Sequence, residues 1–465
     1  MLNAKSIMIF TIFRYTQAFT ISARQIGVKS RLFASSALDC QVTIDSLPNL
    51  LAEAYSHGET DGIIRFAPSI YGKFSADELV SSSLQATKNN KGQAAGILNA
   101  MIGSCFVHKT HEDAAPLAWN LYCTWEEMSA DIELSPDIVT FCNTFSVMNA
   151  VSEHEGGDQD FYKACASQVL DRAQRYSKKL AGSKRRKLLN SLSRRPSKNN
   201  SAIQQIDALK KFSTDLEVLF ENDELIVINK PSGMVVFHNK ITTVGKVSRK
   251  KMKRINEAHK GDDPGFDISL VDILLELGIP LSTLNSDALG VVHRIDRGTS
   301  GAIVLAKTDE MHCKLVTSFF TRSVDKNYIA LIPWKSCIDE SNLIDHGQID
   351  LEVGGRPALS TYKVIKSYPD KAFQLLIKTQ TGRKHQVRLH CARGLGRPIY
   401  LDPLYDERGK NDGFIHENVS ESGKSLENKF FLHASSLRID EFGVNVSADI
   451  PSWWDDILSD LNENK

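Results

Sequence analysis

The first third of the chain arranges its apolar residues with the period of a helix. Within residues 40–180, apolar side chains recur at three- and four-residue steps, so that each set lies on one helix face. The clearest sets are Leu98, Met101, Ile102 and Cys105, then Ala114, Leu117, Ala118, Leu121, Trp125 and Met128. Pro136 stands where another helix should begin, with Ser135 as a suitable cap. The pattern predicts an all-α region of short helices.

The apolar pattern changes after residue 215. Short apolar runs bounded by polar residues replace the helical period, as is typical of strands. They lie at 216–220, 225–228, 291–292, 303–305, 328–331, 361–364, 373–377 and 432–437. Helical spacing returns at 270–277 and 310–320, whereas 236–267 is a polar insertion without core periodicity. The pattern predicts an α+β domain over 216–456, and hence a multidomain protein.

The length of 465 residues fits two or three domains. The first 38 residues contain no Asp or Glu, several basic residues and many Ser, Thr and apolar side chains. This composition is typical of a transit peptide and predicts import into a mitochondrion or a plastid. The apolar run 7–13 is too short to cross a membrane, and we expect no membrane association. A secretory signal is the alternative.

Charge is balanced over the chain but not along it. The formal net charge is zero, yet residues 172–198 contain many basic residues and no acid. A second basic cluster lies at 246–254. Such runs attract phosphate backbones without reading sequence, although many are simply solvated linkers. We expect 181–215 to be a basic linker that also contacts RNA.

The cysteines and glycines predict no prosthetic group. The eight cysteines form no CxxC pair, and no Cys–His spacing suits zinc. The chain also lacks the glycine-rich fingerprints of nucleotide cofactors. We therefore expect reduced thiols, no metal and no cofactor.

One segment carries candidate chemistry, the stretch HRIDRGTSG at 293–301. Asp296 lies there between Arg294 and Arg297, close to the apolar run 303–306. Nearby positive charge favours the ionised form of a carboxylate, which can act as a nucleophile or a base. On spacing alone, an Asp in an ordinary turn is an equally good interpretation.

The same segment resembles the HRLDxxTSG signature of the RluA-type pseudouridine synthases, with Ile295 for the usual leucine. Further blocks of that family follow in order over residues 217–455. They are DELIVINKPSG at 223–233, KNYIAL at 326–331, TGRKHQVRLH at 381–390, Pro398, Ile399, Asp402, Tyr405, and FLHA at 431–434. Lys384 replaces the usual threonine and adds charge that favours RNA. The resemblance implies a mixed, mainly antiparallel sheet with a central cleft.

The resemblance also implies an enzyme that isomerises uridine to pseudouridine in RNA without a cofactor. It assigns the catalytic carboxylate to Asp296, the aromatic ring that stacks on the base to Tyr328, and the ion-pair partner of the carboxylate to Arg388, with Arg383 of the same block as the alternative. Addition of the carboxylate to uracil C6 and action at C1′ both remain open. The resemblance implies substrate contacts by Arg294, Arg297, Arg383 and Lys326.

Two neighbouring histidines are interpreted as structural. We expect His293 to be a satisfied core residue, and His385 with Gln386 to support a strand formed by the TGR block. Two other functions are compatible with the domain. One is an inactive RNA-tethering factor, and the other is a glycosidase-like hydrolase, which would need a second carboxylate that the matched blocks do not supply.

Residues 40–180 resemble a pentatricopeptide repeat array, most clearly from EEM at 126–128 to SPDIVTFCN at 135–143. Asn99 and Asn143 then occupy equivalent places in successive first helices. The resemblance implies that Asn99 with Asp137, and Asn143 in the next repeat, read bases of single-stranded RNA. A generic all-α domain is the alternative. The expected partner is ribosomal, transfer or messenger RNA, and no oligomeric state is predicted.

Overall fold

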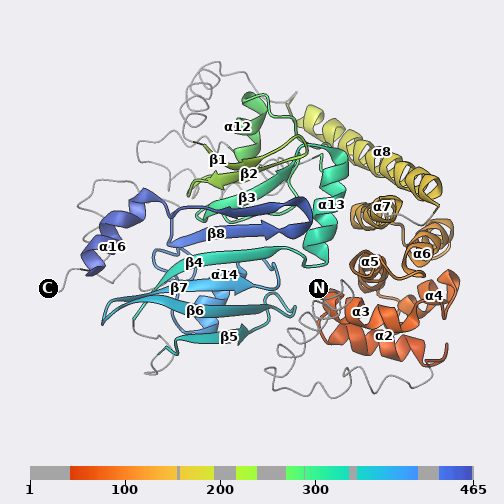
Figure 1. The fold of residues 1–465 in the computed structure, drawn as a ribbon, viewed down its shortest axis with the longest axis horizontal. Helices are drawn as coiled ribbons and strands as arrows, with labels where there is room; N and C mark the ends of the chain where they lie inside the picture. Colours follow the sequence, from red (N-terminus) through yellow and green to blue (C-terminus); the bar gives the residue numbers. More distant parts are fainter. Residues whose placement is uncertain are drawn as a thin grey trace, which may run out of the picture.

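The computed structural model describes residues 42–153, 158–192, 216–237, 269–286, 288–334, 343–406 and 429–462. The predicted transit peptide 1–38, the basic cluster 246–254 and most of the polar insertion lie outside the described residues. Figure 1 shows a helical region packed beside a large sheet. Of the predicted linker 181–215, residues 181–192 continue a helix, and the rest lies outside the described residues.

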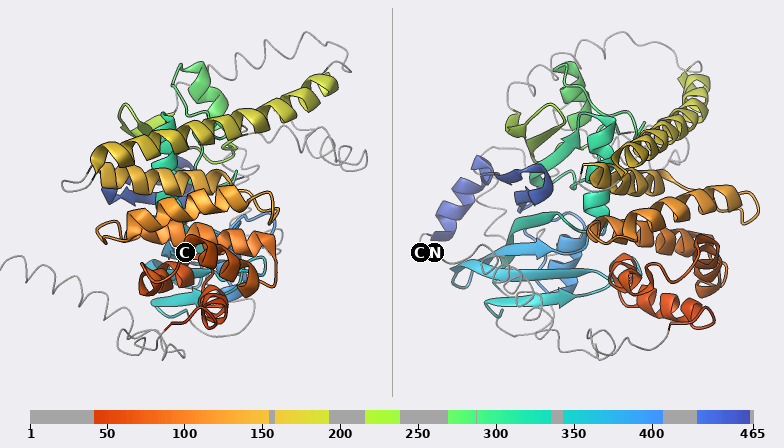
Figure 2. Two further views of the ribbon diagram at one scale, coloured as in Figure 1. Left: turned by 90° about the vertical axis from the view of Figure 1, so that its right-hand side faces the viewer. Right: turned by 45° about the vertical axis from the view of Figure 1, so that its right-hand side comes forward.

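The helical region is all-α, as predicted. Its helices are α2 (Leu47–Ser56), α3 (Thr60–Phe66), α4 (Ala76–Ala86), α5 (Lys91–Val107), α6 (Ala114–Met128), α7 (Ile138–Ser152) and α8 (Gln159–Leu192). Helices α2, α4 and α6 pack side by side in one layer, and α3, α5 and α7 pack in a second layer, with α8 lying on α7. Figure 2 shows this stacking of helical hairpins from two further sides.

Local sequence explains where α7 begins. The Asp137 side chain accepts a hydrogen bond from the Thr140 backbone N–H at 3.0 Å, while the Thr140 hydroxyl accepts one from the Asp137 N–H at 3.1 Å. This reciprocal cap satisfies backbone donors that the first turn leaves unpaired. Asp137 is therefore the cap, and the prediction of Ser135 was wrong by two residues.

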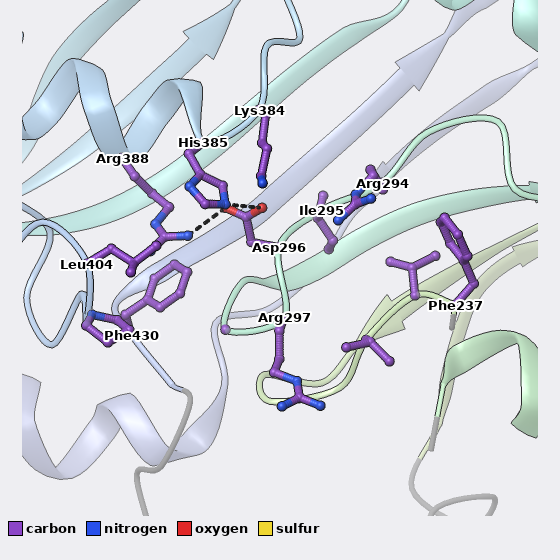
Figure 3. Close-up of a pocket in the computed structure, with 14 residues that line it drawn as sticks. Phe237, Arg294, Ile295, Asp296, Arg297, Lys384, His385, Arg388, Leu404 and Phe430 are labelled. Carbon is purple, nitrogen blue, oxygen red and sulfur yellow. Dashed lines mark hydrogen bonds and ion pairs between the residues drawn. The ribbon is translucent and has the colours of Figure 1, made fainter. Parts of the chain in front are cut away.

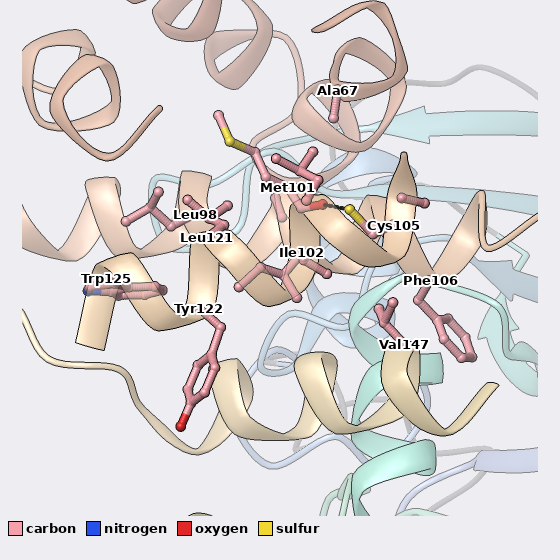
Figure 4. Close-up of a cluster of buried hydrophobic side chains, with 14 of the residues drawn as sticks. Ala67, Leu98, Met101, Ile102, Cys105, Phe106, Leu121, Tyr122, Trp125 and Val147 are labelled. Atoms are coloured by element: carbon pink, nitrogen blue, oxygen red, sulfur yellow. Dashed lines mark hydrogen bonds between the residues drawn. The ribbon is translucent and has the colours of Figure 1, made fainter. Parts of the chain in front are cut away.

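The core of the helical region is formed by the apolar sets that predicted its helices. Met101, Ile102, Leu121 and Trp125 are fully buried between α5, α6 and their neighbours (Figure 4). The Trp125 indole N–H donates to the Leu134 carbonyl at 2.8 Å, so this large side chain is buried with its polar atom satisfied.

The C-terminal domain contains one sheet of nine strands within the described residues. The strands are β1 (Glu217–Glu221), β2 (Leu225–Lys230), β3 (Ser300–Ala306), β4 (Asp325–Pro333), β5 (His346–Asp350), β6 (Leu359–Tyr368), β7 (Ala372–Thr379), β8 (Leu432–Ile439) and β9 (Val444–Ser447). Their order is β1-β2-β3-β8-β4-β7-β6-β5, with β9 beside β8. Only β3 and β8 pair in parallel, so a mixed, mainly antiparallel sheet is confirmed.

Three predictions about the sheet need correction. Residues 291–292 form no strand, because Val291 makes only an isolated bridge to Leu305. Strands β5 and β9 were not predicted. The TGR block forms a turn followed by the short helix α14 (Gln386–Leu389), not a strand.

Two helices cover opposite faces of one half of the sheet. Alternate residues of β2 point to opposite faces. Ile226 and Ile228 pack with α12 (Leu270–Glu276), whereas Leu225 and Val227 pack with α13 (Asp309–Phe320). At the other half, α14 and α16 (Asp455–Asn462) pack near β4, β6 and β7. No helix of the described residues is long and apolar enough to cross a membrane.

The helical region is packed directly against the C-terminal domain. Helix α7 lies on α13, where the Thr317 hydroxyl donates to the Ser146 hydroxyl at 3.0 Å in a buried contact. Leu284 and Cys313 of the C-terminal domain belong to the same hydrophobic cluster as the helices. The two regions therefore share a core and are not joined by a tether alone.

Gly301 → Ala is expected to destabilise the domain by about 3 kcal/mol or more. Gly301 has φ +110°, and a Cβ atom there would lie 2.2 Å from the Ala434 carbonyl oxygen, which is backbone of the paired strand β8. Urea unfolding measures the loss, with Gly354 → Ala as a control because its φ is also positive, at +65°, but its Cβ position is open. Equal losses in the two variants would show that the close approach of β3 and β8 costs nothing.

Candidate active site

The sheet order brings the matched blocks together. Asp296 lies in the loop that leads into β3, Tyr328 lies on β4, and Arg388 lies on α14 after β7. Strands β3, β8, β4 and β7 are consecutive neighbours in the sheet. Residues more than ninety positions apart in sequence therefore meet at one place, as in the 3.1 Å contact between Asp296 and Arg388.

A chain of three charged side chains holds the candidate carboxylate. Arg388 Nη1 donates to Asp296 Oδ2 at 3.1 Å, and its Nε and Nη2 donate to the two oxygens of Asp402 at 2.7 Å each. The side chain of Asp402 is fully buried and that of Arg388 is 4% exposed, whereas that of Asp296 is 21% exposed. Burial alone would lower the pKa of Arg388, but Asp402 and Asp296 raise it. Arg388 is thus a fixed cation that orients Asp296 towards solvent.

His385 lies on the other side of the same carboxylate. Its Nε2 is 3.6 Å from Asp296 Oδ1 (Figure 3). Its Nδ1 is 3.0 Å from the Tyr405 hydroxyl. The backbone of His385 is left-handed, with φ 59°, which turns the chain into α14. Burial lowers the pKa of His385, so that the ring is neutral near pH 7. The interpretation of His385 as support for a strand was wrong.

Tyr328 is half-buried on β4, where a β-bulge at Asn327 and Tyr328 interrupts the pairing with β8. Burial, and then the negative charge of Asp296, raise the pKa of its phenol to about 12. The phenol therefore stays protonated at neutral pH. Tyr328 lies close enough to Asp296 for this effect but does not line the pocket described below.

A buried lysine stabilises the backbone of the loop that carries Asp296. Lys230 Nζ donates to the carbonyls of Pro231, Met234 and Arg297 at 2.9, 2.8 and 3.2 Å. The Lys230 side chain is fully buried at the end of β2, and burial lowers its pKa to about 7. Because Arg297 follows Asp296 directly, this clamp fixes the backbone that carries the candidate carboxylate.

Asp296 lines a pocket of about 310 Å³. This volume is at the lower end of the range for small-ligand sites and suits one flipped-out nucleotide rather than a base pair. Arg294 lines the pocket with its guanidinium 5.7 Å from the Phe237 ring, and Arg297 lines it too, although its side chain points away from Asp296 in Figure 3. The other lining residues are Val235, Val236, Ile295, Gly298, Lys384, His385, Arg388, Pro403, Leu404 and Phe430.

Two predicted substrate contacts lie outside the pocket. Arg383 Nη2 is 2.5 Å from Glu59 Oε2, a carboxylate of the helical region. Lys326 Nζ lies 5.5 Å from the centre of the Phe319 ring, and burial together with Arg322 lowers its pKa to about 8. Neither residue lines the pocket, so direct contact with the reacting nucleotide is not supported for either one.

The residues predicted to read RNA bases are brought together but not presented to solvent. Asn99 Nδ2 donates to Asp137 Oδ1 at 3.4 Å, and Asn143 Nδ2 donates to the Asn99 carbonyl at 3.1 Å. Asn99 is 4% exposed and Asn143 is fully buried, because α5 and α7 pack against each other and α7 packs against α13. A base edge cannot reach either amide in this conformation, and the predicted base-reading role is corrected accordingly.

Three residues that build the site were not predicted to have a role in it. Asp402 was noted only as part of a pattern, yet it fixes Arg388. Lys230 was matched but not connected with Asp296. Phe430 was not singled out, although its ring lies 4.5 Å from the Arg388 guanidinium carbon and lines the pocket. An acid or a lysine within an otherwise apolar neighbourhood was the available signal for the first two residues.

His293 is structural, as interpreted from the sequence. Its Nε2 accepts the Val304 backbone N–H at 3.1 Å, and its ring stacks on Phe319 at 4.4 Å. Burial, with a contribution from Lys326, lowers the pKa of His293 to about 3. An imidazole nitrogen that accepts a backbone N–H must be unprotonated, which agrees with this direction.

The free energy of unfolding is therefore expected to fall as the pH falls from about 6.5 to about 3. In that window the unfolded chain binds a proton at His293 and the native protein does not. The free energy of unfolding that neutral His293 contributes above pH 6.5 is therefore lost as the pH falls, by at most about 1.4 kcal/mol per pH unit. Urea unfolding at several pH values measures the slope. His293 → Gln should make it shallower, and His346 → Gln, at an exposed position, should not. Parallel slopes for all three proteins would contradict the account.

Within the described residues, no group of three His, Cys, Asp or Glu side chains is arranged to hold a metal ion.

Comparison with known proteins agrees with the geometry. Residues 224–393 match the family described as RNA pseudouridylate synthase. This match, together with the similar bacterial proteins, supports a pseudouridine synthase domain of the RluA type in the C-terminal half.

The similar proteins include bacterial and human members. Ribosomal large subunit pseudouridine synthase D of Pseudomonas aeruginosa is 28% identical over 50% of this chain and 66% of its own length. The protein of the same name from Neisseria meningitidis is 30% identical over 51% of this chain and 58% of its own length. A solved human structure, RNA Pseudouridylate Synthase Domain Containing 4, has a TM-score of 0.37 and 22% identity, covering 56% of this chain and 97% of its own. The chain thus spans less than two thirds of the length of these bacterial relatives.

Proposed function

We propose that this protein isomerises uridine to pseudouridine in RNA, with Asp296 as the catalytic carboxylate. The observation that carries the proposal is the fixed pair of Asp296 and Arg388. A carboxylate that is partly exposed in a pocket is oriented by an arginine that a fully buried acid, Asp402, holds in turn. Such a group can attack or deprotonate a substrate without first reorganising.

The reaction breaks the bond between C1′ and N1 of uridine and forms a bond between C1′ and C5. The proton at C5 is released and N1 gains a proton, so that atoms and charge balance without an oxidant. The target nucleotide must leave its stack to reach Asp296, at a cost of about a few kcal/mol. Apolar and aromatic walls, including Phe237 and Phe430, would offset that cost. Tyr328 lies near Asp296 but does not line the pocket, so stacking of its protonated phenol on the base would require the bound nucleotide to extend beyond the lining residues. Asp296 would act at either C6 or C1′.

Large-subunit ribosomal RNA is the first substrate to test, because the similar bacterial proteins are named for that subunit. Transfer and messenger RNA are the alternatives. The basic residues of α8, among them Lys178 and Lys179, would add contacts with the phosphate backbone that do not depend on sequence.

Release of tritium from RNA labelled at uridine C5 tests the activity. In a mixture of purified protein and RNA alone, isomerisation is the reaction that exchanges the C5 hydrogen. The purified full-length protein should release tritium from at least one of the three RNA classes, while a mixture without protein should not. Binding of RNA without release from any class would contradict the proposal and favour the inactive RNA-tethering factor.

The first 38 residues are proposed to direct the protein to a mitochondrion or a plastid, on the strength of their composition. We propose that the helical region resembles pentatricopeptide repeats in the way its helical hairpins stack, and not in base reading. It is supported by the two-layer stacking and by the contact between Asn99 and Asn143 at equivalent places of α5 and α7. Imaging of the full chain with a C-terminal fluorescent fusion tests the location.

A further inference from the structure

The helical region reaches the TGR block through the carboxylate of Glu59. Glu59 Oε2 lies 2.5 Å from Arg383 Nη2, and Glu59 Oε1 lies 3.8 Å from Arg356 Nε. The side chains of Glu59 and Arg383 are only 19% and 20% exposed. An ion pair this sheltered is screened less by salt than one on an open surface.

Glu59 adopts an unusual backbone conformation to make this contact. It occupies the N-cap position of α3, without a side-chain capping hydrogen bond, at φ 52° and ψ −116°, a combination that is sparsely populated for residues other than glycine. Strain of this kind persists only when the surroundings hold the residue in place, and it is concentrated at functional sites. In this conformation the Glu59 carboxylate contacts Arg383 of the C-terminal domain.

Arg383 belongs to a tightly bonded turn. Its backbone N–H donates to Gln386 Oε1 at 3.0 Å, and the Thr381 hydroxyl donates to the same oxygen at 2.6 Å. Its side-chain Nε donates to the Pro357 carbonyl at 3.2 Å. The guanidinium therefore connects the turn to Glu59 on one side and to the segment before β6 on the other.

The next two residues of this turn face the reacting group. Lys384 and His385 both line the pocket, and His385 Nε2 is 3.6 Å from Asp296 Oδ1. Arg388 follows within one helical turn and contacts Asp296 directly. His385 is two residues after Arg383 and Arg388 is five residues after it, so a displacement of Arg383 would also displace these two side chains.

Other contacts between the two regions hold the helical region against the C-terminal domain. Asp61 of α3 forms an ion pair with Arg322, which follows α13. Lys109 Nζ lies 3.0 Å from Glu441 Oε1, a residue between β8 and β9. These contacts, with the shared hydrophobic cluster, hold Glu59 opposite Arg383 rather than letting it sample solvent.

We infer that Glu59 is a positioning residue for the proposed reaction, and that the helical region completes the active site by holding the TGR turn through Arg383. The inference rests on the proposed function. It assigns the helical region a role in catalysis that does not depend on base reading by Asn99 or Asn143. The competing possibility is that Glu59 occupies Arg383 in place of an RNA phosphate and so restrains binding.

Kinetics of full-length Glu59 → Gln test the inference, since the substitution keeps the shape and removes the charge. We expect kcat to fall by about 10- to 100-fold with KM changed less than about twofold, as for a small misplacement of catalytic groups. Glu127 → Gln is the matched control, because Glu127 is an exposed acid on α6. Glu59 → Asp should recover part of the loss. An unchanged kcat, or a lower KM at an unchanged kcat, would overturn the inference, and the second result would favour competition with RNA.

Hydrogen–deuterium exchange provides a readout that does not require activity. Glu59 → Gln should speed exchange at 381–386 at least several-fold and leave β2 and β3 unchanged, whereas Glu127 → Gln should change neither. Equal protection of 381–386 in Glu59 → Gln and the wild type would contradict the inference even if no RNA is ever modified. Conversely, if the wild type has no activity but exchange at 381–386 is faster in Glu59 → Gln, the result would contradict the proposed function and leave the inference about the turn intact.

Discussion

Replacement of Asp296 by asparagine is expected to lower the rate of tritium release by on the order of 10⁴-fold or more, as for other removed nucleophiles. The amide keeps the size of the side chain but can neither attack carbon nor accept a proton as a carboxylate does. The loss should appear in kcat, because the pocket walls that hold the nucleotide are retained. Single-turnover assays with enzyme in excess measure it directly.

The control for this variant is Asp350 → Asn, at an exposed position of β5 away from the pocket. It should retain full activity. A variant at Asp296 that keeps more than about a tenth of the wild-type rate would show that the carboxylate is not the reacting group.

Replacement of Arg388 by methionine should damage both stability and activity. The side chain makes two 2.7 Å hydrogen bonds to Asp402, whose carboxylate is fully buried. Leaving such a charge without its partner costs about 3–5 kcal/mol. Asp296 loses its orienting cation in the same variant. Urea unfolding and the tritium assay measure the two effects separately.

A double variant separates the structural role of Arg388 from its role at Asp296. Arg388 → Met with Asp402 → Asn removes the unpaired charge, so it should regain much of the lost stability, whereas activity should stay low because Asp296 remains without its partner. Recovery of activity together with stability would mean that Arg388 serves only the fold.

Much of the sheet could be predicted because several of its strands are buried on both faces. Strands β2 and β3 are buried along nearly their whole length and contain unbroken apolar runs, which are a strong local signal. The short strands β5 and β9 alternate exposed and buried residues over four or five positions, too few for a distinct pattern. Residues 291–292 form no strand although two valines are adjacent there, because Val291 is buried with a single isolated bridge to Leu305 and Val292 is only partly buried.

The sequence predicted which residues form the site better than where each one points. The pairing of Asp296 with Arg388 followed from the resemblance, and the distance agrees with it. The position of Arg383 could not be predicted, because its partner Glu59 lies 324 residues away in the other region. Asn99 was misplaced for a different reason. Helix α5 is buried around most of its circumference, so no apolar stripe marks a solvent face.

The most direct test of the central claim is a map of pseudouridine across cellular RNA, comparing cells that express the wild type with cells in which only Asp296 → Asn is made. At equal protein level, the account predicts that one or a few sites disappear in the variant and all others persist. A map that is unchanged at every site, with the variant protein present and folded, would contradict catalysis by Asp296.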